Sequence, residues 1–385
     1  MYIIFDGRHI INKYSGLGRF TFSLLLELIN SNNYSKLDII IQDKLKIEDN
    51  EILFYIKNLK NDKIKFIKID APLFNFIKGN NIAKYVNSKN PDLYFYPHFD
   101  IPFGIKAKSI FVVHDVFSKK TFFHEKDNSF IDDFIYSLKK KRYIKNVIFN
   151  NNVKFNLSKK NLSCIAVSNS TKKDMLEFID PIYQDKIKVV YEASFENNIL
   201  IDSSQNFLDE NLFKNKYLLY VGDRRPHKNL KHMIDIFNEI SKKDKSLKFY
   251  IVGSQKLINF DYKKYVRQLN NKNIIEISNV SDTDLQNLYK FCTAFFFLSK
   301  HEGFGLPILE AAKYDKKIIT SNKSSLIEIA PKNSLLLDPY IDIEIATKKI
   351  LSYINKNIII DNKDYLKNFS WKKAMKEIFY NESSN

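Results

Sequence analysis

The chain has 385 residues, of which 44% are hydrophobic, 14% aromatic and 27% charged. This composition is ordinary for a soluble globular protein and excludes intrinsic disorder, and at about 100 to 200 residues per domain the length predicts two domains. Lys and Arg exceed Asp and Glu by 61 to 44, a net charge of +17. Such a charge usually indicates a polyanionic partner, but Asn, Lys, Ile, Phe and Tyr crowd the whole chain, as an A/T-biased genome would produce. The charge is therefore weak evidence for nucleic acid.

The two cysteines, Cys164 and Cys292, lie far apart in apolar runs. This usage fits a reducing cytoplasm and matches neither a disulfide framework nor metal-ligand spacing. The N-terminus has the pattern of an opening β-strand rather than of a signal peptide. No apolar run approaches the roughly 18 residues that span a bilayer. We expect a cytoplasmic protein that does not cross a membrane and holds no metal.

Short β-branched or aromatic runs alternate with amphipathic helical stretches throughout the chain, which is typical of parallel α/β units. The first series of predicted strands comprises 2–5, 37–41, 64–67, 93–96, 109–113, 163–167 and 187–189. The second series comprises 217–221, 248–252, 274–277, 294–298, 317–320 and 334–337.

A polar stretch at 194–216 separates the two series and marks the predicted domain boundary. We expect each half to be a doubly wound parallel sheet, with the two halves facing across a cleft where ligands bind at the carboxyl ends of the strands. The segment 365–380, which contains Trp371, predicts a terminal helix. The basic stretch 137–161 predicts a solvated helical face, and a peripheral contact with a membrane stays open.

The sharpest motif is Ser-Lys-His-Glu-Gly-Phe-Gly-Leu-Pro-Ile-Leu-Glu at 299–310, between an apolar strand and a helical pattern. Pro307 suits the first position of a helix, so the glycine loop leads directly into a helix N-terminus. Amides there, with the positive end of the helix dipole, bind phosphate or sugar oxygens. Gly303 and Gly305 would let a ligand approach the backbone closely.

Two glutamates flank this loop, and their carboxylates are expected to face one ligand. A carboxylate beside a diphosphate would be repelled by about 4 kcal/mol at ~4 Å and an effective dielectric of about 20. We therefore expect Glu302 to meet the hydroxyls of a sugar and Glu310 those of a ribose. A helix with acidic residues near its N-terminus explains Glu310 alone, but explains the whole motif poorly.

Glu302 and Glu310, with Gly-Phe-Gly-Leu-Pro between them, resemble the glutamate pair of retaining glycosyltransferases of family 4, which have the GT-B fold. The likeness covers nearly the whole chain in order and spacing. It includes Gly16-Leu-Gly18-Arg19 before a helix at 20–28, Val112-Val-His114-Asp115, Ala166-Val-Ser-Asn-Ser170, Tyr220 to Asn229, Ser321 to Glu328 and Asp338-Pro339.

This resemblance implies an α/β architecture of two Rossmann-like domains. Residues 1–195 would form the acceptor-side domain and 196–364 the nucleotide-sugar donor domain, and the helix at 365–385 would pack back on the N-terminal domain. The chain is similar to the bacterial mannosyltransferase-like group at Asp6-Gly7-Arg8, His98 and Pro226-His-Lys, which favours GDP-mannose as donor.

The resemblance also implies roles for individual residues. Lys228 would stabilise the leaving diphosphate, and His114 and Glu302 would contact the transferred hexose, which makes these three the catalytic candidates. His98 would contact the acceptor. The donor would be bound by Gly16, Gly18, Arg224, Val280, Gly303, Phe304, Gly305, Leu306 and Glu310.

Structural explanations stay open for several of these residues. Asp223 stands where the family often has arginine, so either Arg224 or Arg225 would supply a second cation. His114 could be a structural histidine whose tautomer Asp115 fixes. The glycine pair at 16 and 18 could form a tight turn, and Val280 could precede a helix cap.

We expect a metal-independent retaining hexosyltransferase with no cofactor beyond its nucleotide-sugar donor. Its partners would be a glycan or lipid-linked glycan acceptor and no nucleic acid, and contact with the inner face of the membrane stays open. The alternatives are a UDP- or dTDP-sugar transferase, a GT-B epimerase or phosphorylase, and, from another class, a basic protein that binds nucleic acid or a membrane surface. An NAD-dependent oxidoreductase is disfavoured because Gly16-Leu-Gly18 lacks the third glycine of the dinucleotide fingerprint.

Overall fold

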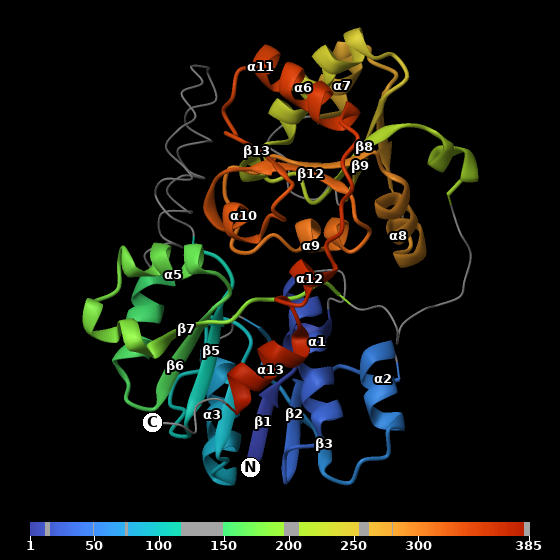
Figure 1. Ribbon diagram of the computed structural model, residues 1–385. Coiled ribbons are helices and arrows are strands. Elements are labelled where there is room, and N and C mark those ends of the chain that lie inside the picture. Colours follow the sequence, from blue (N-terminus) through green and yellow to red (C-terminus); the bar gives the residue numbers. More distant parts are fainter. Residues whose placement is uncertain are drawn as a thin grey trace. The chain divides into compact units, whose positions relative to one another are not determined.

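The computed structural model describes residues 1–11, 16–48, 50–73, 76–116, 149–195, 208–253, 262–278 and 280–380. The chain forms two compact units (Figure 1). The first contains Met1–Glu192 and Trp371–Asn385, and the second contains Ala193–Ser370. Part of the predicted basic helical stretch, 137–148, lies outside the described residues.

The described part of the first unit contains a seven-stranded parallel sheet in the order β3-β2-β1-β4-β5-β6-β7. Strands such as Ser-Ile-Phe-Val-Val at 109–113 are buried along their whole length, because helices cover both faces of a doubly wound sheet. The strands are β1 (Tyr2–Asp6), β2 (Lys36–Gln42), β3 (Ile64–Ile69), β4 (Leu93–Tyr96), β5 (Ser109–Val113), β6 (Leu162–Ala166) and β7 (Ile187–Val189).

Helices lie between most of these strands along the chain. Ser168 caps one of them, since its Oγ accepts a hydrogen bond from the N–H of Thr171 at 2.9 Å. The helices are η1 (Arg8–Ile11), α1 (Gly16–Ser31), α2 (Glu51–Asn58), α3 (Phe76–Lys89), α5 (Asn169–Leu176) and η3 (Pro181–Lys186).

The C-terminal helix α13 (Trp371–Phe379) belongs to the first unit and packs beside α1 (Figure 1). The Trp371 ring lies edge-on against Phe20 of α1, with ring centroids 5.6 Å apart, and the Phe379 ring lies 5.2 Å from that of Phe95 on β4. Lys188 Nζ on β7 donates to the carbonyl of Glu377 at 2.8 Å. The last helix therefore completes the core of the N-terminal sheet.

The described part of the second unit contains a six-stranded parallel sheet in the order β10-β9-β8-β11-β12-β13. The strands are β8 (Tyr217–Val221), β9 (Lys248–Val252), β10 (Ile274–Ile277), β11 (Ala294–Phe297), β12 (Lys317–Ser321) and β13 (Leu335–Leu337). The helices are η4 (Glu210–Lys214), η5 (Pro226–Lys228), α6 (Leu230–Lys243), α7 (Tyr262–Leu269), α8 (Asp282–Phe291), α9 (Leu306–Ala312), α10 (Ser324–Ile329), α11 (Ile343–Asn355) and α12 (Lys363–Leu366).

The predicted class, two doubly wound parallel sheets, is confirmed, and every predicted strand is present with its ends shifted by no more than two residues. The helix expected at 20–28 is present, but it begins earlier, at Gly16, so the glycine loop expected before it was wrong. The single helix expected over 365–380 was also wrong, because this segment is divided into α12 and α13. In the described residues we find no helix with both the length and the apolar character needed to span a bilayer.

Each sheet has one point at which the strand order reverses. In the first sheet it lies between β1 and β4, and in the second between β8 and β11. Open α/β sheets bind ligands at the carboxyl ends of the strands beside such a switch point. The loops after these four strands are therefore where a ligand site is expected.

Candidate active site

The loop after β11 carries Glu302 and leads into α9. Gly305 caps that helix with φ of +109°, a conformation that side chains rarely adopt. A Cβ there would also lie 2.7 Å from Leu326 Cδ2 and 3.0 Å from Ile329 Cδ1. Backbone conformation and packing against α10 thus require this glycine, and its expected role in ligand approach stays a prediction.

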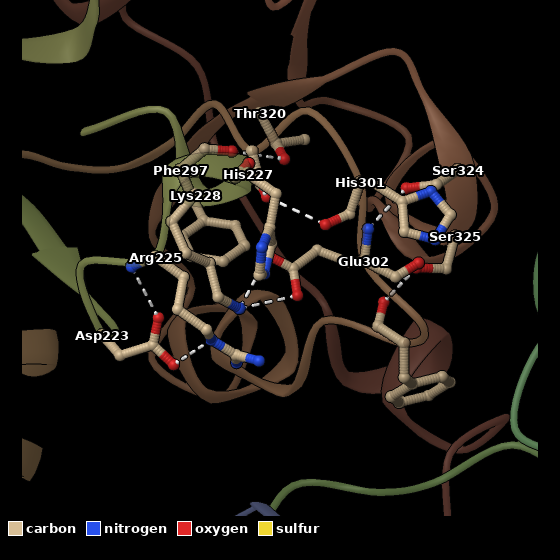
Figure 2. A network of polar contacts seen from close by, with 12 residues as sticks. Asp223, Arg225, His227, Lys228, Phe297, His301, Glu302, Thr320, Ser324 and Ser325 are labelled. Atoms are coloured by element: carbon tan, nitrogen blue, oxygen red, sulfur yellow. Dashed lines mark hydrogen bonds and ion pairs between the residues drawn. The ribbon is translucent and has the colours of Figure 1, made fainter. Parts of the chain in front are cut away.

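Two serines at the start of α10 fix the backbone of this loop. Ser324 Oγ accepts from the N–H of Glu302 at 3.0 Å. Ser325 Oγ lies 2.9 Å from the carbonyl of Glu302 and 2.6 Å from that of Phe304, as Figure 2 shows. These bonds set the position of the Glu302 side chain. Sequence reasoning missed both serines, although they fall in the matched stretch 321–328.

The loop after β8 carries the basic residues and is bonded to the loop after β11. Asn229 takes a left-handed conformation, with φ of +60°, between η5 and α6. Its side-chain amide donates to the carbonyls of Leu298, at 3.1 Å, and Pro339, at 2.7 Å. The N–H of Lys300 donates to the carbonyl of His227 at 2.8 Å. Hydrogen bonds therefore hold the loops after β8 and β11 together, and we call these two loops the platform.

Lys228 and Glu302 meet on this platform as a buried ion pair (Figure 2). Lys228 Nζ lies 2.8 and 2.7 Å from the two carboxylate oxygens, and the two side chains are only 11% and 10% exposed. The ring of Phe297 lies 5.5 Å from the ammonium. A cation and a carboxylate are thus held together at the switch point, and an anionic ligand would compete with Glu302 for Lys228.

The two arginines beside Lys228 are held differently. The side chain of Arg224 is only 3% exposed and forms an ion pair with Glu276 of β10. That of Arg225 is 39% exposed, and its Nε lies 2.8 Å from Asp223 Oδ2. Burial alone would raise the pKa of Asp223, but the hydrogen bond from Arg225 and the charge of Lys228 outweigh it and lower that pKa. Arg225 and Lys228 therefore both act on the Asp223 carboxylate, and Figure 2 shows the three side chains in one network.

Glu310 lies on α9 and accepts a hydrogen bond from the hydroxyl of Tyr289 at 2.6 Å. The two glutamates of the motif thus have different partners in this structure. Val280 is half-buried and directly precedes Ser281, whose Oγ caps α8 by accepting from the N–H of Asp284 at 3.0 Å. Gly303 and Phe304 are buried, and Leu306 is half-buried.

In the first unit, His114 follows β5 and is held through both ring nitrogens. Its Nδ1 lies 3.0 Å from Glu192 Oε1 and its Nε2 lies 2.9 Å from the carbonyl of Pro97. Both partners accept hydrogen bonds, so both nitrogens are placed to donate. Glu192, rather than the predicted Asp115, orients the ring among the contacts described, and a hexose contact would require one of these bonds to open.

The glycine pair lies within the first turn of α1 rather than in a loop before it. Gly16 is exposed, and a Cβ added there would meet no atom within 4 Å, whereas Gly18 is buried. The first turn of a helix is a position where anions bind in proteins, so the predicted donor contact of this glycine pair stays a prediction.

His98, the predicted acceptor residue, follows β4 at the switch point of the first sheet. Its Nδ1 contacts the carboxylate of Asp100, which also accepts from the hydroxyl of Tyr96 at 2.9 Å. His9, which follows β1, lies beside it, with the two imidazole centroids 5.3 Å apart.

Comparisons with known proteins agree with this geometry. Residues 203–370 match the family described as Glycosyl transferases group 1. The solved structure of HepE from Anabaena in complex with UDP-glucose superposes with a TM-score of 0.67 at 16% identity, over 100% of both chains. The chain has the GT-B fold.

Several curated relatives of this GT-B chain are mannosyltransferases by name. The serotype-specific mannosyltransferase WbdA of Escherichia coli is 24% identical over 88% of the chain and 42% of its own length. The O-antigen chain mannosyltransferase B of Escherichia coli is 29% identical over 35% of the chain and 36% of its own length. The chain thus spans less than half the length of these relatives. Together the matches support a GT-B glycosyltransferase.

Proposed function

We propose that the protein is a retaining glycosyltransferase that moves a hexose from a nucleotide-diphosphate sugar to a hydroxyl of a glycan or lipid-linked glycan in surface polysaccharide synthesis. The observation that carries the proposal is the buried Lys228–Glu302 pair at the switch point of the second sheet. It lies in the region matched by the family. A cation for a diphosphate and an acceptor for sugar hydroxyls are thereby placed side by side.

The chemistry we propose is front-face transfer. The bond from the anomeric carbon to the diphosphate oxygen breaks, and the acceptor oxygen bonds to the same face of that carbon. The departing phosphate oxygen takes the acceptor proton, so no side-chain base is needed. Lys228 and an adjacent arginine would stabilise the developing negative charge, while Glu302 would hold hydroxyls of the sugar. These residues supply the charge stabilisation without a metal.

GDP-mannose is the preferred donor, because two of the relatives with matching sequence, WbdA and the O-antigen chain mannosyltransferase B, are named mannosyltransferases. A UDP- or dTDP-sugar is the second candidate, since HepE, with the same fold, was solved with UDP-glucose. We propose that transfer takes place in the cytoplasm, where nucleotide sugars are at hand, and at the inner face of the membrane if the acceptor is lipid-linked.

The experiment is thermal unfolding with GDP, UDP, dTDP and their sugars, in the presence of EDTA. A ligand at about 100 times its Kd stabilises the folded protein by about 2.7 kcal/mol, so one nucleotide series should raise the unfolding temperature selectively. Product analysis by NMR then reads the anomeric configuration. Indifference to all nucleotides, combined with strongly salt-dependent binding of RNA or anionic vesicles, would favour the alternative of a basic binding protein.

A further inference from the structure

The switch point of the first sheet holds a polar cluster, which we call the β1/β4 cluster: His9, Tyr96, His98 and Asp100. Strands β1 and β4 are parallel neighbours, paired through Phe5 and Phe95. Their carboxyl ends therefore bring the residues that follow each strand together. This is the position at which doubly wound sheets bind ligands, and it is the counterpart of the Lys228–Glu302 position in the second sheet.

The polar atoms of the cluster converge on a small volume. Tyr96 donates its hydroxyl proton to Asp100 Oδ1, at 2.9 Å, and its oxygen lies 3.4 Å from His9 Nε2. Ligating atoms of His9, His98 and Asp100 all lie within 4.8 Å of one another. The ring of Phe99 lies against His98, with centroids 4.3 Å apart. A carboxylate, two imidazoles and an aromatic ring together suit the hydroxyls and the apolar face of a sugar.

Among the described residues that contact this cluster, the charges cancel or are negative. Arg8 is neutralised by Asp6, with its Nε and Nη2 at 2.8 and 2.9 Å from the two carboxylate oxygens, and its Nη1 donates to the carbonyl of Ala71 at 2.8 Å. Burial lowers the pKa of His9 to about 4, so this imidazole is neutral at pH 7.

Asp100 supplies the negative charge. Burial alone would raise its pKa, but the hydrogen bonds and charge of His98 and the hydroxyl of Tyr96 lower it, so the carboxylate is ionised. Since Arg8 is paired and His9 is neutral, His98 can at most offset Asp100. Within the part of the chain that the structure describes, these contacts leave the cluster no surplus cation for an anionic group.

We propose that the β1/β4 cluster binds a neutral sugar at the end of the acceptor and that Asp100 discriminates against an acceptor sugar that carries a carboxylate or phosphate. This inference rests on the proposed function, which it deepens by naming the acceptor class. Asp100 would accept hydrogen bonds from sugar hydroxyls. An anion in the same position would meet a like charge, which costs affinity.

The test is binding of a matched pair of probes to the full chain by saturation-transfer NMR and competition. Octyl α-mannuronamide and octyl α-mannuronate differ chiefly in charge. We expect the wild type to bind the neutral amide at least about tenfold more tightly than the carboxylate, and Asp100→Asn to reduce this ratio to about threefold or less. Asp62→Asn, at an exposed carboxylate before β3, is the control and should keep the wild-type ratio.

Equal binding of both probes by the wild type, which requires no variant to fold, would overturn the inference. So would stabilisation by Zn²⁺ alone that Asp100→Asn abolishes, because the three groups would then form a metal site. Thermal shifts with nucleotides report on the second unit and should be the same in Asp100→Asn and the wild type. If nucleotides raise the unfolding temperature but the two probes bind equally well, this inference is refuted and the proposed function is not.

Discussion

Lys228→Met removes the ammonium from the buried pair while keeping most of the side-chain volume. Because both side chains are about one-tenth exposed, the Glu302 carboxylate would remain buried without its cation. Losing one partner of such a pair costs about 3 to 5 kcal/mol, which in a domain of this size lowers the unfolding temperature by about 6 to 20 °C. If Lys228 also stabilises the leaving diphosphate, turnover should fall about a hundredfold or more.

The double variant Lys228→Met with Glu302→Gln separates the two effects. It removes both charges, so we expect most of the lost stability to return, while turnover stays low. Lys231→Met is the matched control, since this lysine is 56% exposed in a surface pair with Asp235 and should change unfolding by less than about 1 kcal/mol. Differential scanning fluorimetry and release of nucleotide from the donor give the two readouts. Near-normal turnover in Lys228→Met, measured below its unfolding temperature, would remove this lysine from the mechanism.

Three further variants test other parts of the molecule. Gly16→Ala should leave the unfolding temperature unchanged, because the added Cβ would meet open space. If a donor phosphate approaches this turn, the methyl group should raise KM for the donor severalfold. An unaltered KM would argue that no donor phosphate approaches Gly16. Arg225→Ala should raise KM for the donor by about tenfold with little loss of stability. Arg224→Ala should mainly destabilise the second unit, because it removes a buried side chain and its ion pair with the half-buried Glu276. The reverse pattern would assign the second cation to Arg224. Finally, burial lowers the pKa of His9 from 6.5 to about 4 on folding. As pH falls from 6.5 to 4, the unfolded chain binds a proton at His9 that the folded chain does not, so up to about 3 kcal/mol of stability is lost. His9→Gln should flatten that part of the curve of unfolding temperature against pH, and an unchanged slope would contradict the burial argument.

The strands could be predicted closely because parallel strands covered on both faces are written as continuous apolar runs, such as Ala-Phe-Phe-Phe at 294–297. The helix break before Trp371 could not be predicted from the sequence, because an amphipathic pattern continues across 367–370. Side-chain pairing was also beyond local pattern. Lys228 and Glu302 are separated by 74 residues and His114 and Glu192 by 78, and only the sheet order brings them together.

The position of α13 in the first unit means that the chain passes from one unit to the other twice, near residue 192 and again near residue 370. During synthesis the core of the first unit is therefore completed only after the whole second unit has been made, by a helix that begins more than 170 residues after Glu192. A nonsense mutation just before Trp371 would leave the second unit's own sequence intact. It would instead remove the ring of Trp371 from Phe20 and that of Phe379 from Phe95 in the first unit. Loss of the C-terminal helix would therefore destabilise the first unit rather than the second.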